Sequence, residues 1–455
     1  MVLSASIKLV LFIATIALAA IADVGATAIQ PRTTHYKVRA NRLKAASKRA
    51  SSKVNAAYYP NWAIYSPYDF QPTEINTTSL THLFYAFADI STDSERNLKT
   101  VLSVGGGSCS DHFSFITDSS KRATFVTSAV QMIEDYGFDG TDVDFEFPDT
   151  AARGSGLASL ITELRTAFDD LQEKKGDTTP YILTAATSAI VSLYTHMNFP
   201  ELDAALDFWN LMAYDYTGSW TDTADDQANL YGGSRTGVST DTAINDYISR
   251  GVTVSKISLG LPVYSRSFED TSGLRDSYDG VGSGTSEAGI YFYRDLAKSG
   301  ATVYENTTDV SAYSYDSSKR ELVSYDTPNI AKLKAQYVQS KGLAGTFFFD
   351  LSTDKKGNGS LVDTTADVYG DLDQTQNHIN YPNSKWTNIR NNMGQGSGSS
   401  SASTTQSSTA STHQSTSTTS RSSTSTSSGS EPNIGSQVAQ RSNSATGPPS
   451  IHQKV

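Results

Sequence analysis

Three carboxylic acids stand at every second position in the stretch Phe138–Phe147, which reads FDGTDVDFEF. They are Asp142, Asp144 and Glu146. Side chains two positions apart on a β-strand share a face and lie roughly 6.6 Å apart, so we expect these carboxyls to line up. Carboxyls this close together do not all ionise near neutral pH, and at least one keeps its proton. A carboxyl that keeps its proton is a usable general acid.

The residues between these acids are apolar and argue against a solvated surface strand. Val143, Phe145 and Phe147 are expected to point the other way, into a layer of helices. Asp139 has the opposite parity from the three acids and lies near the start of the strand. A calcium site is the alternative interpretation, because three carboxylates can bind a hard cation.

Eight short apolar runs alternate with helix-like segments, which predicts an α/β fold, a (β/α)8 TIM barrel. In that fold, catalytic groups lie at the carboxyl ends of the strands. The predicted strands are Asn55–Tyr59, Leu83–Ala88, Thr100–Val104, Gly140–Phe145, Ile182–Ala186, Asp207–Ala213, Ile257–Leu261 and Gly345–Phe349.

Two connections between the predicted strands have unusual lengths. The segment of about 269–321 after the seventh strand is rich in Gly and Tyr, which predicts a small α+β insertion forming one wall of a cleft. In contrast, only nine residues separate Ala88 from Leu98. A parallel crossover normally needs a dozen or more residues including its helix. The second crossover helix is therefore missing, or the second and third strands are joined abnormally.

Composition excludes several classes of function. The formal net charge of −11 argues against nucleic acid or an anionic membrane as a partner, since both require a basic face. Cys109 is the single cysteine, which rules out an intramolecular disulfide and a cysteine-built zinc site. The seven histidines show no paired metal-ligand spacing. The sequence therefore predicts no metal and no organic cofactor.

The two ends of the chain are predicted to lie outside the folded barrel, which we place at 53–372. An apolar run, Leu9–Ala20, is too short to span a bilayer and predicts a signal peptide over 1–28. The basic segment 29–49 ends in Lys48-Arg49, which resembles a kexin-type processing site; a propeptide and a charged linker are both open interpretations.

Beyond the barrel we expect a linker over 373–396 and a disordered tail over 397–455. Ser and Thr make up 26 of the 34 residues from Ser397 to Ser430, a composition that cannot build an apolar core. Asn-X-Ser/Thr triplets at Asn76, Asn306 and Asn358 are compatible with a secreted glycoprotein.

The carboxylate stretch resembles the D-G-x-D-x-D-x-E signature of glycoside hydrolase family 18, the chitinases. The resemblance extends across nearly the whole predicted barrel, in the family's order. The segments that carry it are Tyr58-Tyr59-Pro60-Asn61-Trp62, Ser103-Val104-Gly105-Gly106, Met212-Ala213-Tyr214-Asp215, Gly218-Ser219-Trp220 and Gly260–Phe268.

The resemblance implies a retaining mechanism in which the substrate's own 2-acetamido group is the nucleophile, an exception to the scheme with two catalytic carboxylates. Glu146 would be the general acid. Asp144 would orient the acetamido group, and Asp142 would share a proton with Asp144. Tyr214 would bond the acetamido oxygen, and Asp215 the sugar near the cleaved bond.

The resemblance also implies a groove for chitin or N-acetylglucosamine oligomers. Two positions depart from the family pattern: Gly107 follows the S-x-G-G motif where Trp is usual, and Phe349 stands where a Trp usually forms the floor under the sugar. Phe offers a smaller stacking face and no indole N–H, so we expect weaker binding. The expected groove residues are Tyr58, Trp62, Phe87, Gly105, Gly106, Phe147, Met212, Ala213, Arg266 and Phe349.

The predicted function is therefore a secreted, monomeric endochitinase that hydrolyses β-1,4-N-acetylglucosamine linkages outside the cell or at the cell wall. Two alternatives remain. One is a weak or inactive chitin-binding lectin on the same barrel, which the presence of Glu146 disfavours. The other is an endo-β-N-acetylglucosaminidase, which the insertion after the seventh strand disfavours.

Overall fold

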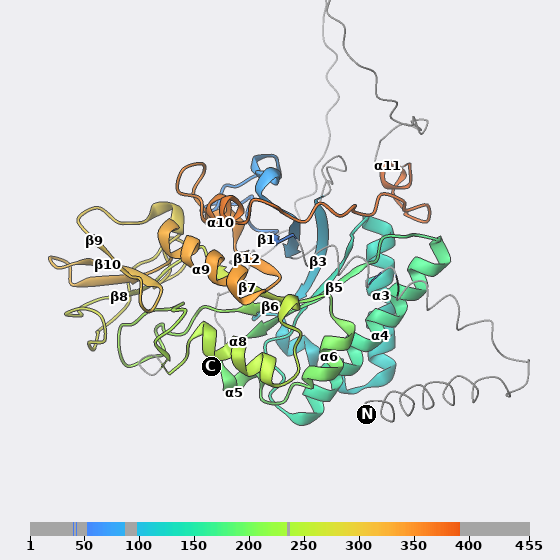
Figure 1. Cartoon of the computed structure of the whole chain (residues 1–455), viewed down its shortest axis with the longest axis horizontal. Helices are drawn as coiled ribbons and strands as arrows, with labels where there is room; N and C mark the ends of the chain where they lie inside the picture. Colours follow the sequence, from blue (N-terminus) through green and yellow to red (C-terminus); the bar gives the residue numbers. More distant parts are fainter. Residues whose placement is uncertain (1–39, 41, 43–51, 87–97, 234–236, 392–455) are drawn as a thin grey trace, which may run out of the picture.

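The computed structural model describes residues 40, 42, 52–86, 98–233 and 237–391 (Figure 1). The predicted signal peptide, most of the basic segment, the groove residue Phe87 and the Ser/Thr-rich tail lie outside the described residues.

Eight parallel strands close a barrel in the order β1-β12-β7-β6-β5-β4-β3-β2, which confirms the predicted fold. Buried parallel strands are nearly continuous apolar runs, and this made them recognisable in the sequence. Their bounds are β1 Val54–Pro60, β2 His82–Ala86, β3 Lys99–Gly105, β4 Gly140–Asp144, β5 Ile182–Ser188, β6 Phe208–Met212, β7 Ile257–Pro262 and β12 Gly345–Phe349.

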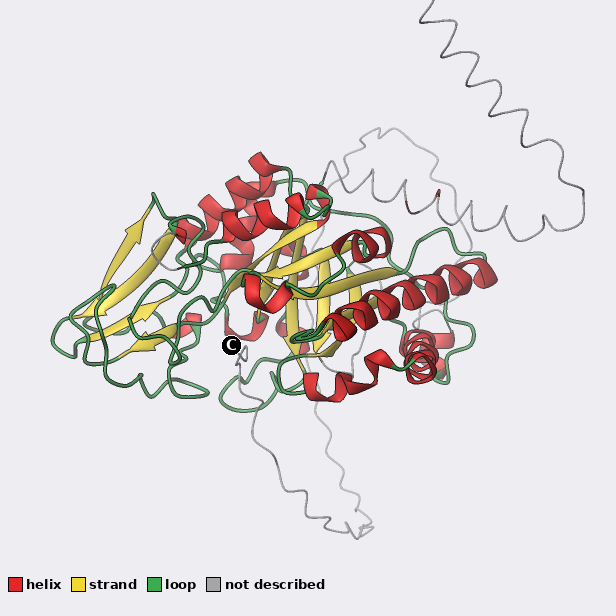
Figure 2. Ribbon diagram, turned by 90° about the horizontal axis from the view of Figure 1, so that it is seen from below, coloured by secondary structure: helices red, strands yellow, loops and turns green. Residues whose placement is uncertain are grey.

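Helices cover the outside of the barrel (Figure 2). The long ones begin at side-chain caps and end at left-handed glycines: Asp118 and Gly137 bound α3, and Thr150 and Gly176 bound α4. The helices are α3 Ser119–Tyr136, α4 Ala151–Lys175, α5 Val191–Tyr194, α6 Phe199–Ala205, α8 Thr240–Ser249, α9 Pro328–Lys341, α10 Leu361–Tyr369 and α11 Thr387–Arg390. The 3-10 turns are η1 Pro72–Glu74, η2 Thr77–Ser79, η3 Ser110–Thr117, η4 Val254–Lys256, η5 Tyr293–Asp295 and η6 Leu351–Thr353.

Buried apolar side chains form two main clusters, one on each side of the barrel wall. The larger cluster lies between strands and helices and contains Val143 and Phe145, as predicted. The smaller one fills the barrel and includes Tyr58, Phe84 and Phe347. Phe147 packs against the inner cluster, so its predicted position in the helix layer was wrong. Strand β4 ends at Asp144, and the alternation of faces does not extend beyond that residue.

The insertion after β7 is a second, antiparallel sheet in the order β8-β11-β10-β9, which lies beside the barrel (Figure 1). Its strands are β8 Arg266–Phe268, β9 Thr302–Asn306, β10 Ser311–Asp316 and β11 Glu321–Ser324. Between β8 and β11 the helical structure is the 3-10 turn η5. The predicted small insertion is thus present, and its regular structure is the four-stranded sheet and one 3-10 turn, joined by long loops.

Strands β2 and β3 pair in parallel register, with His82 opposite Lys99, so the short second connection does not prevent closure of the barrel. Residues 87–97 of that connection lie outside the described residues. The outer face of β3 borders a hollow of about 550 Å³. Its apolar lining comes from β3, η3 and α3, and includes Leu102, Phe113, Phe125 and Met132.

Residues 373–391 form a C-terminal strap that crosses the amino-terminal end of the barrel, as Figure 1 shows for the segment from α10 to α11. The backbone N–H of His378 donates to Asp139, and the Tyr381 hydroxyl donates to the Phe138 carbonyl. Asp373, Tyr381 and Ser384 are buried. The prediction that 373–396 is a linker was therefore wrong over the strap. Its sequence is mostly polar and is held by hydrogen bonds, so no apolar periodicity marked it as folded.

Candidate active site

Two glycines bring β3 against the carboxylate strand at its carboxyl end. Gly105 has φ +124°, and a Cβ there would lie 1.9 Å from the Asp144 carbonyl oxygen. The N–H of Gly106 donates to that same oxygen, at 2.9 Å. A side chain at Gly105 would push β4 away, so this glycine is needed for the close approach of the two strands.

Asp142 lies at the centre of a buried hydrogen-bond network inside the barrel. Its Oδ2 accepts from the Tyr58 and Ser103 hydroxyls, both at 2.8 Å. Its Oδ1 accepts from Thr184 at 2.6 Å and from Asn210 Nδ2 at 3.3 Å. Burial raises the pKa of Asp142, and the four donors oppose that rise.

Asp144 has few partners by comparison. It is 7% exposed, and its Oδ1 has no hydrogen-bond partner among the described residues. Burial raises the pKa of Asp144 well above its ordinary value, and the charges of Glu146 and Asp142 raise it further. An acceptor oxygen that faces no donor is available to a group that enters the site from outside.

Glu146 lies just beyond the end of β4, half-buried at the mouth of the barrel. Its backbone N–H donates to Ser110 Oγ at 2.8 Å, and that hydroxyl donates to the Gly106 carbonyl at 2.9 Å. Burial and the negative charge of Asp215 raise the pKa of Glu146 to about 8. The side chain therefore holds a proton at neutral pH, which general acid chemistry requires.

Asp215 and Arg266 form a buried ion pair opposite the carboxylate strand. Arg266 Nε lies 2.8 Å from Asp215 Oδ1, and the guanidinium carbon lies 4.9 Å from the centre of the Trp220 ring. Asp215 has φ +60°, a left-handed conformation that Asp tolerates better than most residues. Next to it, burial raises the pKa of Tyr214 well above its ordinary value, and Asp215 adds to the rise.

Aromatic rings line the same end of the barrel. Tyr58 stacks on Phe84 at 4.8 Å and contacts Phe349 at 5.8 Å between ring centres. Phe349 and Phe147 are both half-buried and pack against the inner cluster.

Of the other expected groove residues, Met212 belongs to the inner cluster, and Trp62 is half-buried in the loop after β1. Ala213 packs in the outer cluster, so its side chain faces the helices and not the groove.

The structure thus brings together the five residues predicted to be catalytic, along with others that sequence reasoning did not select. Ser103, Thr184 and Asn210 bond Asp142, and Ser110 holds the Glu146 backbone. In β3 and β5, Ser103 and Thr184 stand directly opposite Asp142 in register, so parity across neighbouring strands could have identified them. Within the described ranges, no group of three or more His, Cys, Asp or Glu side chains is placed to hold a metal ion.

Comparison with known proteins agrees with this geometry. The family model "Glycosyl hydrolases family 18" matches residues 54–354. Chitinase 1 of Aphanocladium album is 36% identical over 391 residues, covering 76% of this chain and 92% of that protein. Endochitinase 1 of Metarhizium robertsii is equally similar, at 36% identity over the same shares.

Solved structures are similar as well. A class V chitinase from Nicotiana tobaccum, in complex with NAG4, has a TM-score of 0.62 at 27% identity, over 70% of this chain and 99% of that one. A family 18 chitinase from Cycas revoluta, in complex with (GlcNAc)3, has a TM-score of 0.62 at 26% identity, over 70% and 100%. This chain belongs to glycosyl hydrolase family 18.

Proposed function

We propose that this protein is a secreted chitinase that cleaves the β-1,4 bonds between N-acetylglucosamine residues and retains the anomeric configuration. The main support is the protonated Glu146, whose pKa is about 8, beside an Asp144 oxygen without a partner, at the carboxyl end of the barrel. Its relatives carry the names chitinase and endochitinase, and its structural neighbours were solved with N-acetylglucosamine oligomers.

In the proposed first step, Glu146 gives its proton to the glycosidic oxygen as the bond from that oxygen to the anomeric carbon breaks. The carbonyl oxygen of the sugar's 2-acetamido group forms a bond to the same carbon and closes an oxazolinium ring. Water then attacks the anomeric carbon and gives a proton to the Glu146 carboxylate. The ring opens, and the β-configuration is restored because both displacements invert it.

Asp144 is proposed to accept a hydrogen bond from the acetamido N–H and to offset the positive charge of the ring. Burial and the neighbouring carboxyls raise its pKa well above normal, so Asp144 holds its proton in the free enzyme. The positive charge that forms beside it favours the ionised carboxylate, which in turn stabilises that charge. Asp142, held by four donors, would share a proton with Asp144.

Tyr214 is proposed to donate to the acetamido oxygen. Its raised pKa keeps the phenol protonated, as a donor must be. Asp215, fixed by Arg266, is proposed to bond the sugar near the cleaved linkage. The insertion sheet would form one wall of the groove, and the rings of Tyr58, Trp62, Phe147 and Phe349 would contact the oligomer.

The test of this proposal is hydrolysis of a fluorogenic N-acetylglucosamine oligomer by wild type and by Glu146→Gln. We expect kcat to fall by roughly 10²–10⁴-fold with binding retained, because Gln cannot donate a carboxyl proton. Asp149→Asn is the matched control: it changes an exposed carboxylate three residues away and should leave kcat unchanged. Turnover retained in Glu146→Gln would contradict the acid assignment, and no turnover in a folded wild type that binds the oligomer would favour the lectin alternative.

The wild-type pH profile gives a second test of the same proposal. Because Glu146 must be protonated to act, and its pKa is about 8, kcat/KM should fall as the pH rises through that value. The two coupled carboxyls will show this as an apparent pKa of the pair.

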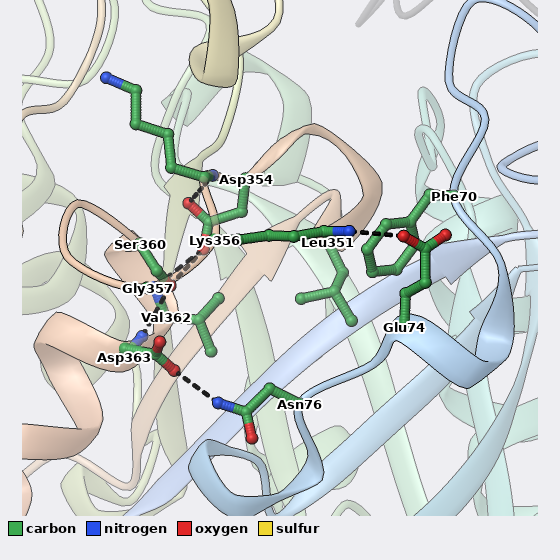
Figure 3. Close-up of a pocket in the computed structure, with 11 residues that line it drawn as sticks. Phe70, Glu74, Asn76, Leu351, Asp354, Lys356, Gly357, Ser360, Val362 and Asp363 are labelled. Carbon is green, nitrogen blue, oxygen red and sulfur yellow. Dashed lines mark hydrogen bonds and ion pairs between the residues drawn. The ribbon is translucent and has the colours of Figure 1, made fainter.

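We also propose that the protein acts outside the cell as a monomer, after loss of a signal peptide over 1–28, with the tail of 397–455 outside the barrel. Asn76, Asn306 and Asn358 are proposed glycan sites. Asn76 is exposed at the rim of a hollow of about 200 Å³, where its Nδ2 donates to Asp363 at 3.2 Å (Figure 3). Peptide mass spectrometry before and after N-glycan removal would test all three sites.

A further inference from the structure

Arg42, one of the two described residues of the basic segment 29–49, contacts the barrel. Arg42 Nη2 donates to the backbone carbonyl of Ala205 at 3.2 Å, and Arg42 Nη1 lies 3.8 Å from Asp169 Oδ2. Both charged side chains are less than one-fifth exposed, at 18% and 19%. The contact is therefore more sheltered from solvent than an ordinary surface ion pair.

The surface that receives Arg42 is built from α4 and α6 and has two acceptors that suit a cation. Ala205 is the last residue of α6, and the carbonyls of a helix C-terminus carry partial negative charge. Asp169 lies on α4, where Arg165 Nε holds its other oxygen at 2.9 Å. We call Asp169 and Ala205 the anchor surface.

Neighbouring groups hold the anchor surface in place without Arg42. Arg165 also pairs with Asp207 at 3.2 Å, and Lys256 donates to the Leu206 carbonyl at 2.9 Å. Lys256 thereby ties the chain just after α6 to η4. The two acceptors are thus positioned by the barrel itself, and the basic segment only has to dock on them.

Charge and chain length both favour binding of the basic segment 29–49 to the anchor surface of its own chain. Residues 29–49 contain seven Lys and Arg and no acid, whereas the whole chain has a net charge of −11. From Arg42 to β1, residues 43–53 can span at most roughly 36–40 Å. Strands β1 and β6 begin at the same end of the barrel, and β6 starts just after α6, so that length suffices to reach the anchor surface.

We propose that Arg42 anchors a leader, residues 29–49, to the anchor surface at the amino-terminal end of the barrel, and that cleavage after Lys48-Arg49 releases it. Cleavage turns an intramolecular contact into a bimolecular one, and the high effective concentration is lost. The anchor surface lies at the end of the barrel opposite to Glu146. The Arg42 contact is therefore away from the groove, and we expect a leader held there to leave activity unchanged, in contrast to an inhibitory propeptide.

The experiment measures hydrogen exchange of leader amides in the chain 29–455, with Lys48→Ala and Arg49→Ala so that the leader stays attached. We expect Arg42→Ala and Asp169→Asn each to speed leader exchange severalfold, and the double variant to show less than the product of the two effects, because the residues contact each other. Lys44→Ala is the control for loss of one leader charge and should change exchange less than twofold. Leader exchange in wild type as fast as in the isolated peptide, or fully independent effects of the two variants, would overturn the proposal.

Activity provides the second measurement. The chain with its leader and the chain starting at Ala50 should hydrolyse a soluble oligomer with kcat/KM values within twofold of each other. A tenfold or greater rise on leader removal would overturn the placement at the far end of the barrel. The exchange experiment does not depend on turnover, so it tests the docking even in a protein that binds chitin without cleaving it.

Discussion

The pKa values of buried carboxyl groups shift in opposite directions at the two ends of the barrel. At the carboxyl end, Asp144 and Glu146 are surrounded by other carboxyls, and burial with those negative neighbours raises their pKa values. At the amino-terminal end, burial alone would raise the pKa of Asp373 and Asp177, but nearby cations outweigh it and lower both. Burial is common to both ends, so the neighbours decide the direction of the shift.

The partners at the amino-terminal end come from well-separated parts of the chain. Lys99, at the start of β3, lies 3.4 Å from Asp373 of the C-terminal strap. Lys175, at the end of α4, lies 3.4 Å from Asp177, and His378 of the strap lies 3.6 Å from the same carboxylate. The Lys99–Asp373 and His378–Asp177 contacts tie the strap to the barrel. The paired end is built for stability, and the end with unpaired carboxyls is suited to chemistry.

Asp139 shows that the contrast is one of degree. It accepts backbone N–H bonds from Thr100 and from His378 of the strap, yet burial outweighs them and its pKa is raised. The charges of His378 and Lys99 also lower the pKa of Asp139, and together with the two backbone donors they do not reverse the effect of burial there. At Asp373, which lies 3.4 Å from Lys99, the favourable contacts outweigh burial and the pKa is lowered.

The largest expected effect comes from removing an unpaired carboxylate. Asp144→Asn should lower kcat by about 10²–10³-fold, because its charge no longer offsets the positive charge of the proposed intermediate. The measurement is steady-state hydrolysis of a fluorogenic oligomer, together with thermal unfolding. Stability should be unchanged or increased, since a buried carboxyl with like-charged neighbours is lost. A large loss of stability would mean that Asp144 is a structural group like Asp373, and the comparison would fail.

The next effect concerns the paired end. Asp373→Asn should lower the free energy of unfolding by about 3 kcal/mol, because it removes the negative charge that lies 3.4 Å from the buried Lys99 ammonium. Denaturant unfolding measures this, and kcat should stay at the wild-type value. Asp371→Asn changes an exposed carboxylate two residues earlier and should have little effect.

The pH dependence of the stability of Asp373→Asn gives a more specific test of the ion pair. The folded pKa of Asp373 is lower than its unfolded value, so its contribution to stability is present above the unfolded pKa and is lost as the pH falls through the folded one. The stability difference between wild type and Asp373→Asn should therefore shrink below pH 4. A difference that stays constant down to acid pH would indicate a packing effect.

The two ends also differ in how well the sequence predicted them. The carboxylate strand could be predicted because alternating acids and apolar residues are typical of few structures other than a buried strand. Glu146, Asp144 and Asp142 lie together as expected. The folded structure of the strap could not be predicted from its sequence. Its residues are mostly polar, and their hydrogen-bond partners, such as Asp139 and Phe138, lie more than 200 positions earlier.

Errors within the site have similar causes. Phe147 was assigned to the helix layer by extending strand parity past Asp144, where the strand ends. Asn210 was not identified because its contact with Asp142 crosses the barrel interior, between strands that are not neighbours. Contacts across a barrel depend on its closure, which no local pattern encodes.

The smallest expected effect concerns the sugar floor at the unpaired end. Phe349 contacts Tyr58 at 5.8 Å and is half-buried, so its ring has one face against the barrel interior. Phe349→Trp should tighten oligomer binding by about two- to tenfold, because an indole gives a larger stacking face and an N–H donor. Measuring Kd by calorimetry in the Glu146→Gln background separates binding from turnover. Phe349→Leu, which keeps an apolar side chain but removes the ring, should weaken binding. If the proteins with Phe, Trp and Leu at position 349 bind the oligomer with equal Kd, the side chain at 349 packs against the barrel without touching the sugar. The groove then lies elsewhere along this end.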